Sequence, residues 1–148
     1  MRVRMFDLAT AASTRGGLTT VVDGGFNVVE ADTYPTSLDL RLALAIEVDL
    51  DGSVADVDVR LAVTTEDGES VGVEDFRRTS RVEIETTEYG EQTTQGASVI
   101  IPMPIDTTNL MIPAPGRYRF TLYDGEKEVS FIRLFAELAE KVDSDSHT

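Results

Sequence analysis

Apolar and polar residues alternate along much of the chain, and the alternation is most regular between Leu38 and Leu50. Successive side chains of a β-strand point to opposite faces, so such a segment covers a core with one face and meets water with the other. The apolar positions are Leu38, Leu40, Leu42, Leu44, Ile46, Val48 and Leu50. The opposite face carries Asp39, Arg41, Glu47 and Asp49. The pattern predicts a long strand of an antiparallel sheet whose polar face is solvated.

Turn residues separate this strand from the segments that follow. Asp51-Gly52 predicts a tight turn, and apolar residues at every second position of 57–63 predict a second strand that pairs with the first as a hairpin. After Glu66-Asp67-Gly68, a charged segment at about 77–87 contains few apolar residues. Charged side chains are typical of edge strands because they discourage unwanted pairing. We therefore predict an edge strand at 77–87.

The C-terminal third is also predicted to consist mainly of strands. Pro102 and Pro104 lack the amide donors of a central ladder, so 99–105 is predicted at an edge or beside a bulge. Residues 118–122 and 128–134 flank Asp124-Gly125 and predict a hairpin. Residues 135–141 are predicted to add one or two helical turns, and 142–148 to form a disordered acidic tail.

Three shorter segments near the N-terminus, at 2–8, 18–22 and 26–31, also have strand length and are separated by glycine-containing turns. In all, about eight or nine short strands are predicted, with almost no helical periodicity. Such a pattern favours two packed antiparallel sheets or a barrel. We predict a two-sheet antiparallel β-sandwich, immunoglobulin-like or C2-like, formed by a single domain over 1–141.

The residue types present exclude several kinds of enzyme. The chain has no cysteine, and its single histidine, His147, lies in the predicted tail. Thiolate nucleophiles, cysteine zinc sites, histidine-dependent triads and multi-histidine metal centres are therefore excluded. A carboxylate-dependent hydrolase remains, but glycosidases of that kind need a sugar cleft, usually lined by aromatic rings, and the chain has no tryptophan. We predict a non-catalytic protein without a cofactor.

Charge and hydropathy limit the classes of partner and the cellular compartment that we predict. The formal net charge of −14 opposes binding to nucleic acids and to anionic membranes, so neither is predicted as a partner. Asp7 interrupts the first apolar run, and no segment approaches the roughly 18 apolar residues of a membrane span. We expect a cytoplasmic protein. Arg77, Arg78 and Arg81 are expected to offset neighbouring acids on an exposed strand, and an anion site is the alternative.

Acidic residues at the predicted turns are the candidate metal ligands. Asp49 and Asp51 adjoin one turn, and Glu66, Asp67 and Glu69 adjoin another. Calcium takes about six to eight oxygen ligands, which such carboxylates could supply if the two turns lie at the same end of the sandwich. The alternative is that aspartate favours turns and that a chain with 27 acidic residues must place some of them together. No EF-hand loop occurs.

Several short motifs resemble a known family. They are Ala11-Ala12, Gly16-Gly17-Leu18, Asp23-Gly24-Gly25-Phe26, Pro35, the Asp67-Gly68 turn and the strand Gly116-Arg117-Tyr118-Arg119-Phe120. Together they resemble a family of small uncharacterised bacterial all-β proteins, classed as a domain of unknown function. The resemblance covers nearly the whole chain. It implies a fold, and it implies no activity, catalytic residue or binding residue.

The sequence therefore favours a protein that acts through protein–protein contacts, including self-association. The strands expected to provide these contacts are the exposed edges at 81–85 and 99–105. The alternative is a small-ligand or calcium-binding module that uses acidic loops at one end of the sandwich. A carboxylate-dependent hydrolase is the third hypothesis.

Overall fold

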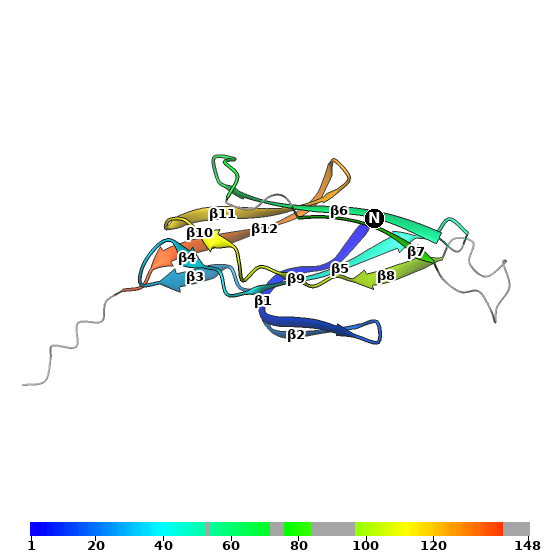
Figure 1. The fold of residues 1–148 in the computed structure, drawn as a ribbon, viewed down its shortest axis with the longest axis horizontal. Coiled ribbons are helices and arrows are strands. Elements are labelled where there is room, and N and C mark those ends of the chain that lie inside the picture. The colour runs from blue at the N-terminus through cyan, green and yellow to red at the C-terminus, as the bar shows by residue number, and fades with distance from the viewer. Residues whose placement is uncertain (53, 72–75, 84–96, 141–148) are drawn as a thin grey trace, which may run out of the picture.

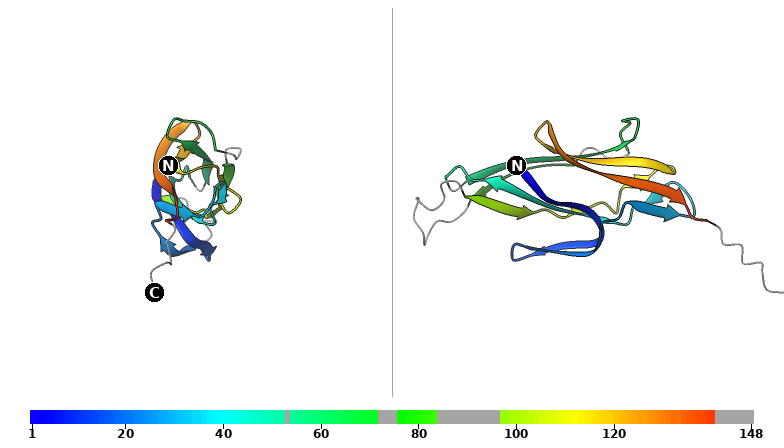
Figure 2. Two further views of the ribbon diagram at one scale, coloured as in Figure 1. Left: turned by 90° about the vertical axis from the view of Figure 1, so that its left-hand side faces the viewer. Right: turned by 180° about the vertical axis from the view of Figure 1, so that it is seen from behind.

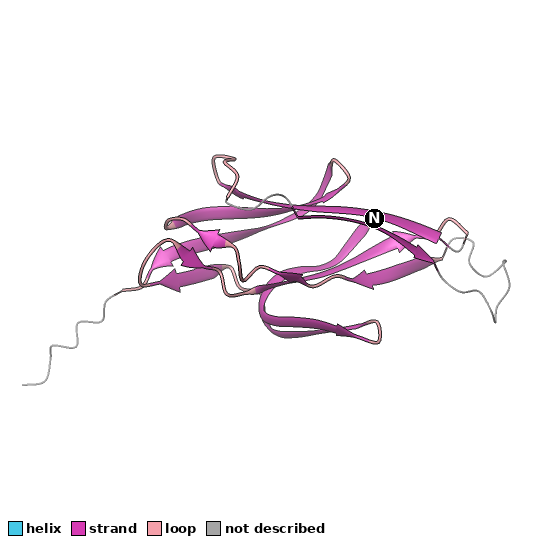
Figure 3. Ribbon diagram, viewed as in Figure 1, coloured by secondary structure: helices cyan, strands magenta, loops and turns pink. Residues whose placement is uncertain are grey.

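The computed structural model describes residues 1–52, 54–71, 76–83 and 97–140 of the chain. Within these ranges the strands are β1 (Arg2–Arg15), β2 (Leu18–Gly24), β3 (Val28–Ala31), β4 (Thr36–Ser37), β5 (Arg41–Asp49), β6 (Val54–Thr65), β7 (Phe76–Glu83), β8 (Ser98–Pro102), β9 (Ile105–Asp106), β10 (Met111–Ile112), β11 (Gly116–Asp124) and β12 (Lys127–Leu138). The described residues form strands and loops and no helix, as Figure 3 shows. The all-β prediction is confirmed.

The strands form two curled sheets that face each other (Figures 1 and 2). One sheet has the order β2-β1-β5-β8, and the short strand β9 also pairs with β5. The other sheet has the order β3-β12-β11-β6-β7. A two-stranded ladder joins β4 to β10. All pairs are antiparallel except β3 with β12, which is parallel. No helix within the described ranges is long and apolar enough to cross a bilayer.

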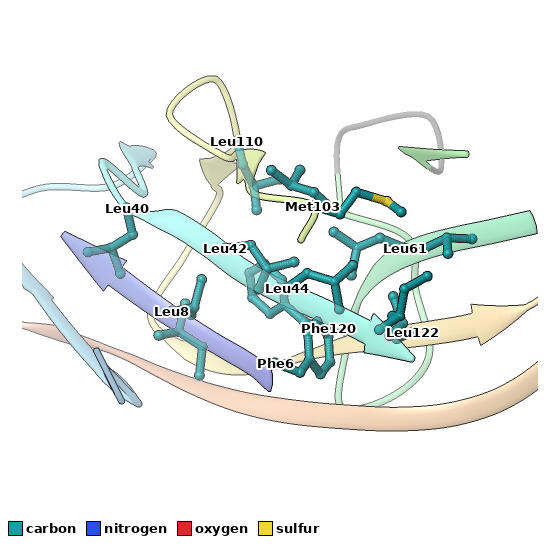
Figure 4. Packing of buried hydrophobic residues seen from close by; sticks show 14 of the residues in the cluster. Phe6, Leu8, Leu40, Leu42, Leu44, Leu61, Met103, Leu110, Phe120 and Leu122 are labelled. Carbon is teal, nitrogen blue, oxygen red and sulfur yellow. The ribbon is translucent and has the colours of Figure 1, made fainter. Parts of the chain in front are cut away.

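One hydrophobic core fills the space between the sheets (Figure 4). Leu42, Leu44 and Ile46 enter it from β5, and Phe120 and Leu122 enter it from β11. All five side chains are fully buried. Because each comes from alternate positions of its strand, the core is formed by the period-two pattern that the sequence predicts.

Several predicted features of the sheet edges are confirmed. The charged strand β7 lies at one end of its sheet, and β8, which ends at Pro102, lies at an end of the other sheet. The hairpin that turns at Asp124-Gly125 is formed by β11 and β12. The parts of the predicted segments at 84–87 and 141–148 lie outside the described residues.

The predicted hairpin around Asp51-Gly52 is wrong. A tight turn is present, since Asp51 and Val54 exchange backbone hydrogen bonds of 2.8 and 3.2 Å, but it leads from β5 in one sheet to β6 in the other. Both strands bury an apolar face in the same core, one from each side. Alternation predicts which face of a strand is buried. It does not distinguish a neighbour in the same sheet from a strand in the facing sheet.

The predicted helix at 135–141 is also wrong as far as the chain is described, because β12 continues to Leu138. Ala136 pairs with Gly116 of β11 on one side and with Val29 of β3 on the other. The alanine, glutamate and leucine residues of this segment are good helix formers. Two ladders of backbone hydrogen bonds and the burial of Leu134 and Ala136 outweigh that local preference.

Candidate functional site

The carboxylates proposed as calcium ligands lie far apart. Asp49 and Asp51 precede β6, whereas Glu66 and Asp67 follow it. The 12 residues of β6 span about 40 Å, and Figure 1 shows its two ends at opposite sides of the molecule. Asp49 instead accepts a 2.6 Å hydrogen bond from Arg2. The two acidic turns therefore do not meet at one end of the fold, and the described residues contain no group of three or more potential metal ligands.

A buried carboxylate on β5 was missed by the sequence prediction, which placed Glu47 on a solvated face. Glu47 is only 5% exposed. Oε1 of Glu47 accepts a hydrogen bond from Ser98 Oγ at 2.6 Å and forms an ion pair with Arg2 at 2.9 Å. Oε2 accepts a hydrogen bond from Arg4. The hydrogen bond from Ser98 lowers the pKa of Glu47 most, burial opposes this shift, and the two arginines reinforce it. The small residues Ala43 and Ala45 on the same face are the sequence signal for this burial.

Two arginines of β7 form bidentate ion pairs with β6. Arg77 donates to both carboxylate oxygens of Asp58 at 3.0 and 2.7 Å, and Arg81 donates to both of Asp56 at 2.8 and 3.1 Å. These hydrogen bonds are the main reason that the pKa of each aspartate is lowered. The prediction that these two arginines offset neighbouring acids is confirmed. Their guanidinium groups are occupied, so they do not form an anion site.

Acid is expected to destabilise the protein through these carboxylates. The folded-state pKa of Glu47 lies below its ordinary value of 4.5, and those of Asp56 and Asp58 lie below 3.8. Their stabilisation is fully present above the ordinary values. It is lost as the pH falls through the folded-state pKa values, because the unfolded chain then binds more protons than the folded one.

Urea unfolding measured across this pH range tests the expectation. The free energy of unfolding of the wild-type protein should fall as the pH drops below 4.5. In Glu47→Gln, the part of this slope that comes from Glu47 should disappear. A variant with the same pH dependence as the wild type would contradict the assignment.

The hairpin formed by β2 and the second half of β1 projects from the body of the molecule (Figures 1 and 2). Its turn is Gly16-Gly17, and both glycines have positive φ, at 57° and 76°, as a two-residue type I′ turn requires. Leu18 is 75% exposed and Val22 is 48% exposed. A two-stranded ribbon with an uncovered face is marginally stable in water. Leu18 is the most exposed large apolar side chain within the described ranges.

The hairpin differs in charge from the rest of the chain. Between Asp7 and Asp23 there is no acidic residue, and Arg15 is the only charged one. The whole chain has 27 acidic residues in 148 and a net charge of −14. The sequence prediction selected the edges at 81–85 and 99–105 and missed β2. The sequence feature that could have identified β2 is the acid-free run that includes Leu18-Thr19-Thr20-Val21-Val22.

Comparisons with known proteins identify a family and no relative of known activity. No curated protein matches the chain, and no solved structure matches it. One family model does match, described as a family of unknown function, DUF6941. This confirms the resemblance to an uncharacterised family. Because that model matches residues 4–137 of the 148, the chain belongs to the DUF6941 family.

Proposed function

We propose that this protein is a non-catalytic β-sandwich, immunoglobulin-like or C2-like in its packing, that acts through protein–protein contacts in the cytoplasm. In this proposal β2 is the contact strand, and its partner is β2 of a second copy of the chain. The projecting hairpin with its exposed Leu18 is the observation that carries the proposal. The small-ligand alternative at the acidic turns has less support, because those turns lie at opposite ends of β6.

The properties of the sheet edges favour β2 over the other candidates. The edge strand β7 carries Arg77, Arg78 and Arg81, and β8 ends at Pro102. Charged residues and proline are the usual means by which proteins protect an edge from pairing. Strand β2 has neither until Asp23, and its Leu-Thr-Thr-Val-Val run combines β-branched residues with no charge. Of these three edges, β2 is therefore the best suited to pair with another strand.

Charge supports a second copy as the partner. Two chains of net charge −14 repel each other over most of their surfaces. An acid-free hairpin that extends away from the body lets two copies meet while their acidic surfaces stay apart. Antiparallel pairing of β2 with its symmetry mate is an isologous contact, which closes a dimer without leaving the same edge free for further addition.

The register of the hairpin shows which backbone groups are free for this pairing. In a two-residue hairpin the residues that close the turn, here Arg15 and Leu18, direct their N–H and C=O groups toward each other. The direction then alternates along each strand. The backbone groups of Thr20 and Val22 point toward β1, whereas those of Thr19 and Val21 point toward the open edge.

Val21→Pro is the variant that tests the dimer most directly. Proline removes an amide donor of the open edge and leaves the β1 ladder intact, so we expect the variant to dimerise at least about tenfold more weakly than the wild type. Light scattering after size exclusion at micromolar concentration should give twice the chain mass for the wild type and the chain mass for the variant.

Val21→Ala is the matched control, since it keeps the amide and removes most of the same side chain. It should remain dimeric if backbone pairing holds the two copies together. Circular dichroism should show that all three proteins keep the same β-structure. A wild-type protein that is monomeric throughout this concentration range, or a dimeric Val21→Pro, would refute the proposal.

A further inference from the structure

A hollow of about 440 Å³ lies on the side of the molecule away from β7, between β1 and β12. Asp7 of β1 lines one side of it. The connection from β2 to β3 contributes Phe26 and Asn27, and β12 contributes Phe131, Arg133 and Phe135. Neither the ion pairs described above nor the hairpin edge involves these residues. The hollow is therefore a separate feature from the proposed dimer contact.

Backbone hydrogen bonds fix the walls of the hollow relative to one another. The carbonyl of Leu8 accepts hydrogen bonds from the amides of Gly25 at 2.9 Å and Phe26 at 3.2 Å. The amide of Phe135 donates to the carbonyl of Asn27 at 2.7 Å. The connection is thereby tied to β1 on one side and to β12 on the other. A site built between these elements is held in place before a ligand arrives, which reduces the entropy lost on binding.

Aromatic rings give the hollow an apolar surface that is partly exposed. Phe26 is 36% exposed and Phe131 is 40% exposed, although phenylalanine is among the residues most often buried. Phe135, which is half-buried, also lines the hollow. Aromatic rings that line one hollow can cover an apolar group of a ligand.

Positive charge is concentrated at one side of these rings. Arg133 lies directly opposite Arg119 on the neighbouring strand β11, and the two guanidinium groups are 4.9 and 4.2 Å from the centre of the Phe131 ring. Like charges directly across a sheet are destabilising. Glu128 binds Arg119 at 2.5 Å, whereas Arg133 forms no ion pair with any described residue. Arg133 is therefore available to a carboxylate from outside.

Asp7 provides the opposite charge on the facing wall, and it also forms no ion pair with another residue in the described ranges. A simple organic anion in the hollow would be repelled by Asp7, and a simple cation would be repelled by Arg133. A zwitterion with an apolar body satisfies all of these groups at once.

We propose that this hollow binds an α-amino acid with a large apolar side chain. Arg133 pairs with its carboxylate, Asp7 pairs with its ammonium group, and the side chain packs among Phe26, Phe131 and Phe135. The planar guanidinium of arginine is suited to a carboxylate because it can donate two parallel hydrogen bonds. This binding would be independent of the dimer contact at β2.

Titration calorimetry with L-phenylalanine as the probe tests the proposal on the full chain. The wild type should bind it saturably at millimolar concentration. Arg133→Gln and Asp7→Asn should each weaken this binding about tenfold, since each removes one charged hydrogen-bonding partner. Both side chains are exposed, so the variants should keep the wild-type unfolding midpoint. Arg78→Gln removes an exposed arginine on β7 and should bind as the wild type does.

Two analogues assign the charged contacts separately. N-acetyl-L-phenylalanine lacks the ammonium group and keeps the carboxylate, so it should bind more weakly to the wild type. Asp7→Asn should not weaken its binding further and should strengthen it, because the variant removes the repulsion between Asp7 and this anion. Phenethylamine lacks the carboxylate, so Arg133→Gln should not weaken its binding and should strengthen it, because the variant removes the repulsion between Arg133 and this cation. The proposal is refuted if phenylalanine gives no saturable heat, if either variant binds it as the wild type does, or if the acetylated analogue binds as tightly as phenylalanine.

Discussion

Replacing Phe120 with alanine is expected to lower the free energy of unfolding by about 3–5 kcal/mol. Phe120 is fully buried on β11, in the middle of its sheet, where it pairs with Val63 of β6 on one side and Ile132 of β12 on the other. Figure 4 shows its ring in the same cluster as Phe6 and Leu44 of the facing sheet. Truncation removes apolar contacts with both sheets and leaves a cavity that rigid β-structure cannot collapse to fill.

Urea unfolding measures this loss, with Phe131→Ala as the matched control. Phe131 lies on the neighbouring strand and faces outward, so the same chemical change there should cost about 1 kcal/mol. A difference of this size is a large part of the stability of a small domain, which is about 5–15 kcal/mol. Similar losses for the two variants would contradict the placement of the core between the two sheets.

Replacing Ala136 with proline is expected to destabilise the protein by about 3 kcal/mol or more. Ala136 is buried and pairs with strands on both sides, Gly116 of β11 and Val29 of β3. Proline cannot donate to a ladder, and a residue with neighbours on both sides has no free edge to accommodate it. The lost free energy should include the contribution of pairing between β3 and β12, because β3 pairs with no other described strand.

Glu140→Pro provides the control for this variant. Glu140 follows the end of β12, after the last backbone bond of this segment, which Ala139 donates to Ala31 at 3.0 Å. Proline at 140 should therefore change the free energy of unfolding by less than about 0.5 kcal/mol. Thermal or urea unfolding of both variants gives the comparison. A well-tolerated Ala136→Pro would show that this segment is not a strand paired on both sides.

Local chemistry in the sequence determined most of the strands and turns. Alternation from Leu38 to Leu50 identified the core-facing residues of β5, because a pleated strand must send successive side chains to opposite faces. Turn residues such as Asp51-Gly52 and Asp124-Gly125 marked the ends of strands, since glycine supplies the positive φ that tight turns need. Proline and charge likewise identified β8 and β7 as edges.

Long-range pairing decided the features that the sequence could not supply. The middle of the polar face of β5 proved to be covered, so Glu47 is buried among Arg2, Arg4 and Ser98, residues up to 51 positions away. The segment after Phe135 is a strand because β3 and β11 bind it on both sides, against its local preference for helix. Asp7 and Arg133 face the same hollow although they come from opposite ends of the chain. Period-two alternation describes one strand and its two faces; which strand lies beside it depends on contacts between distant segments, and those form only in the folded protein.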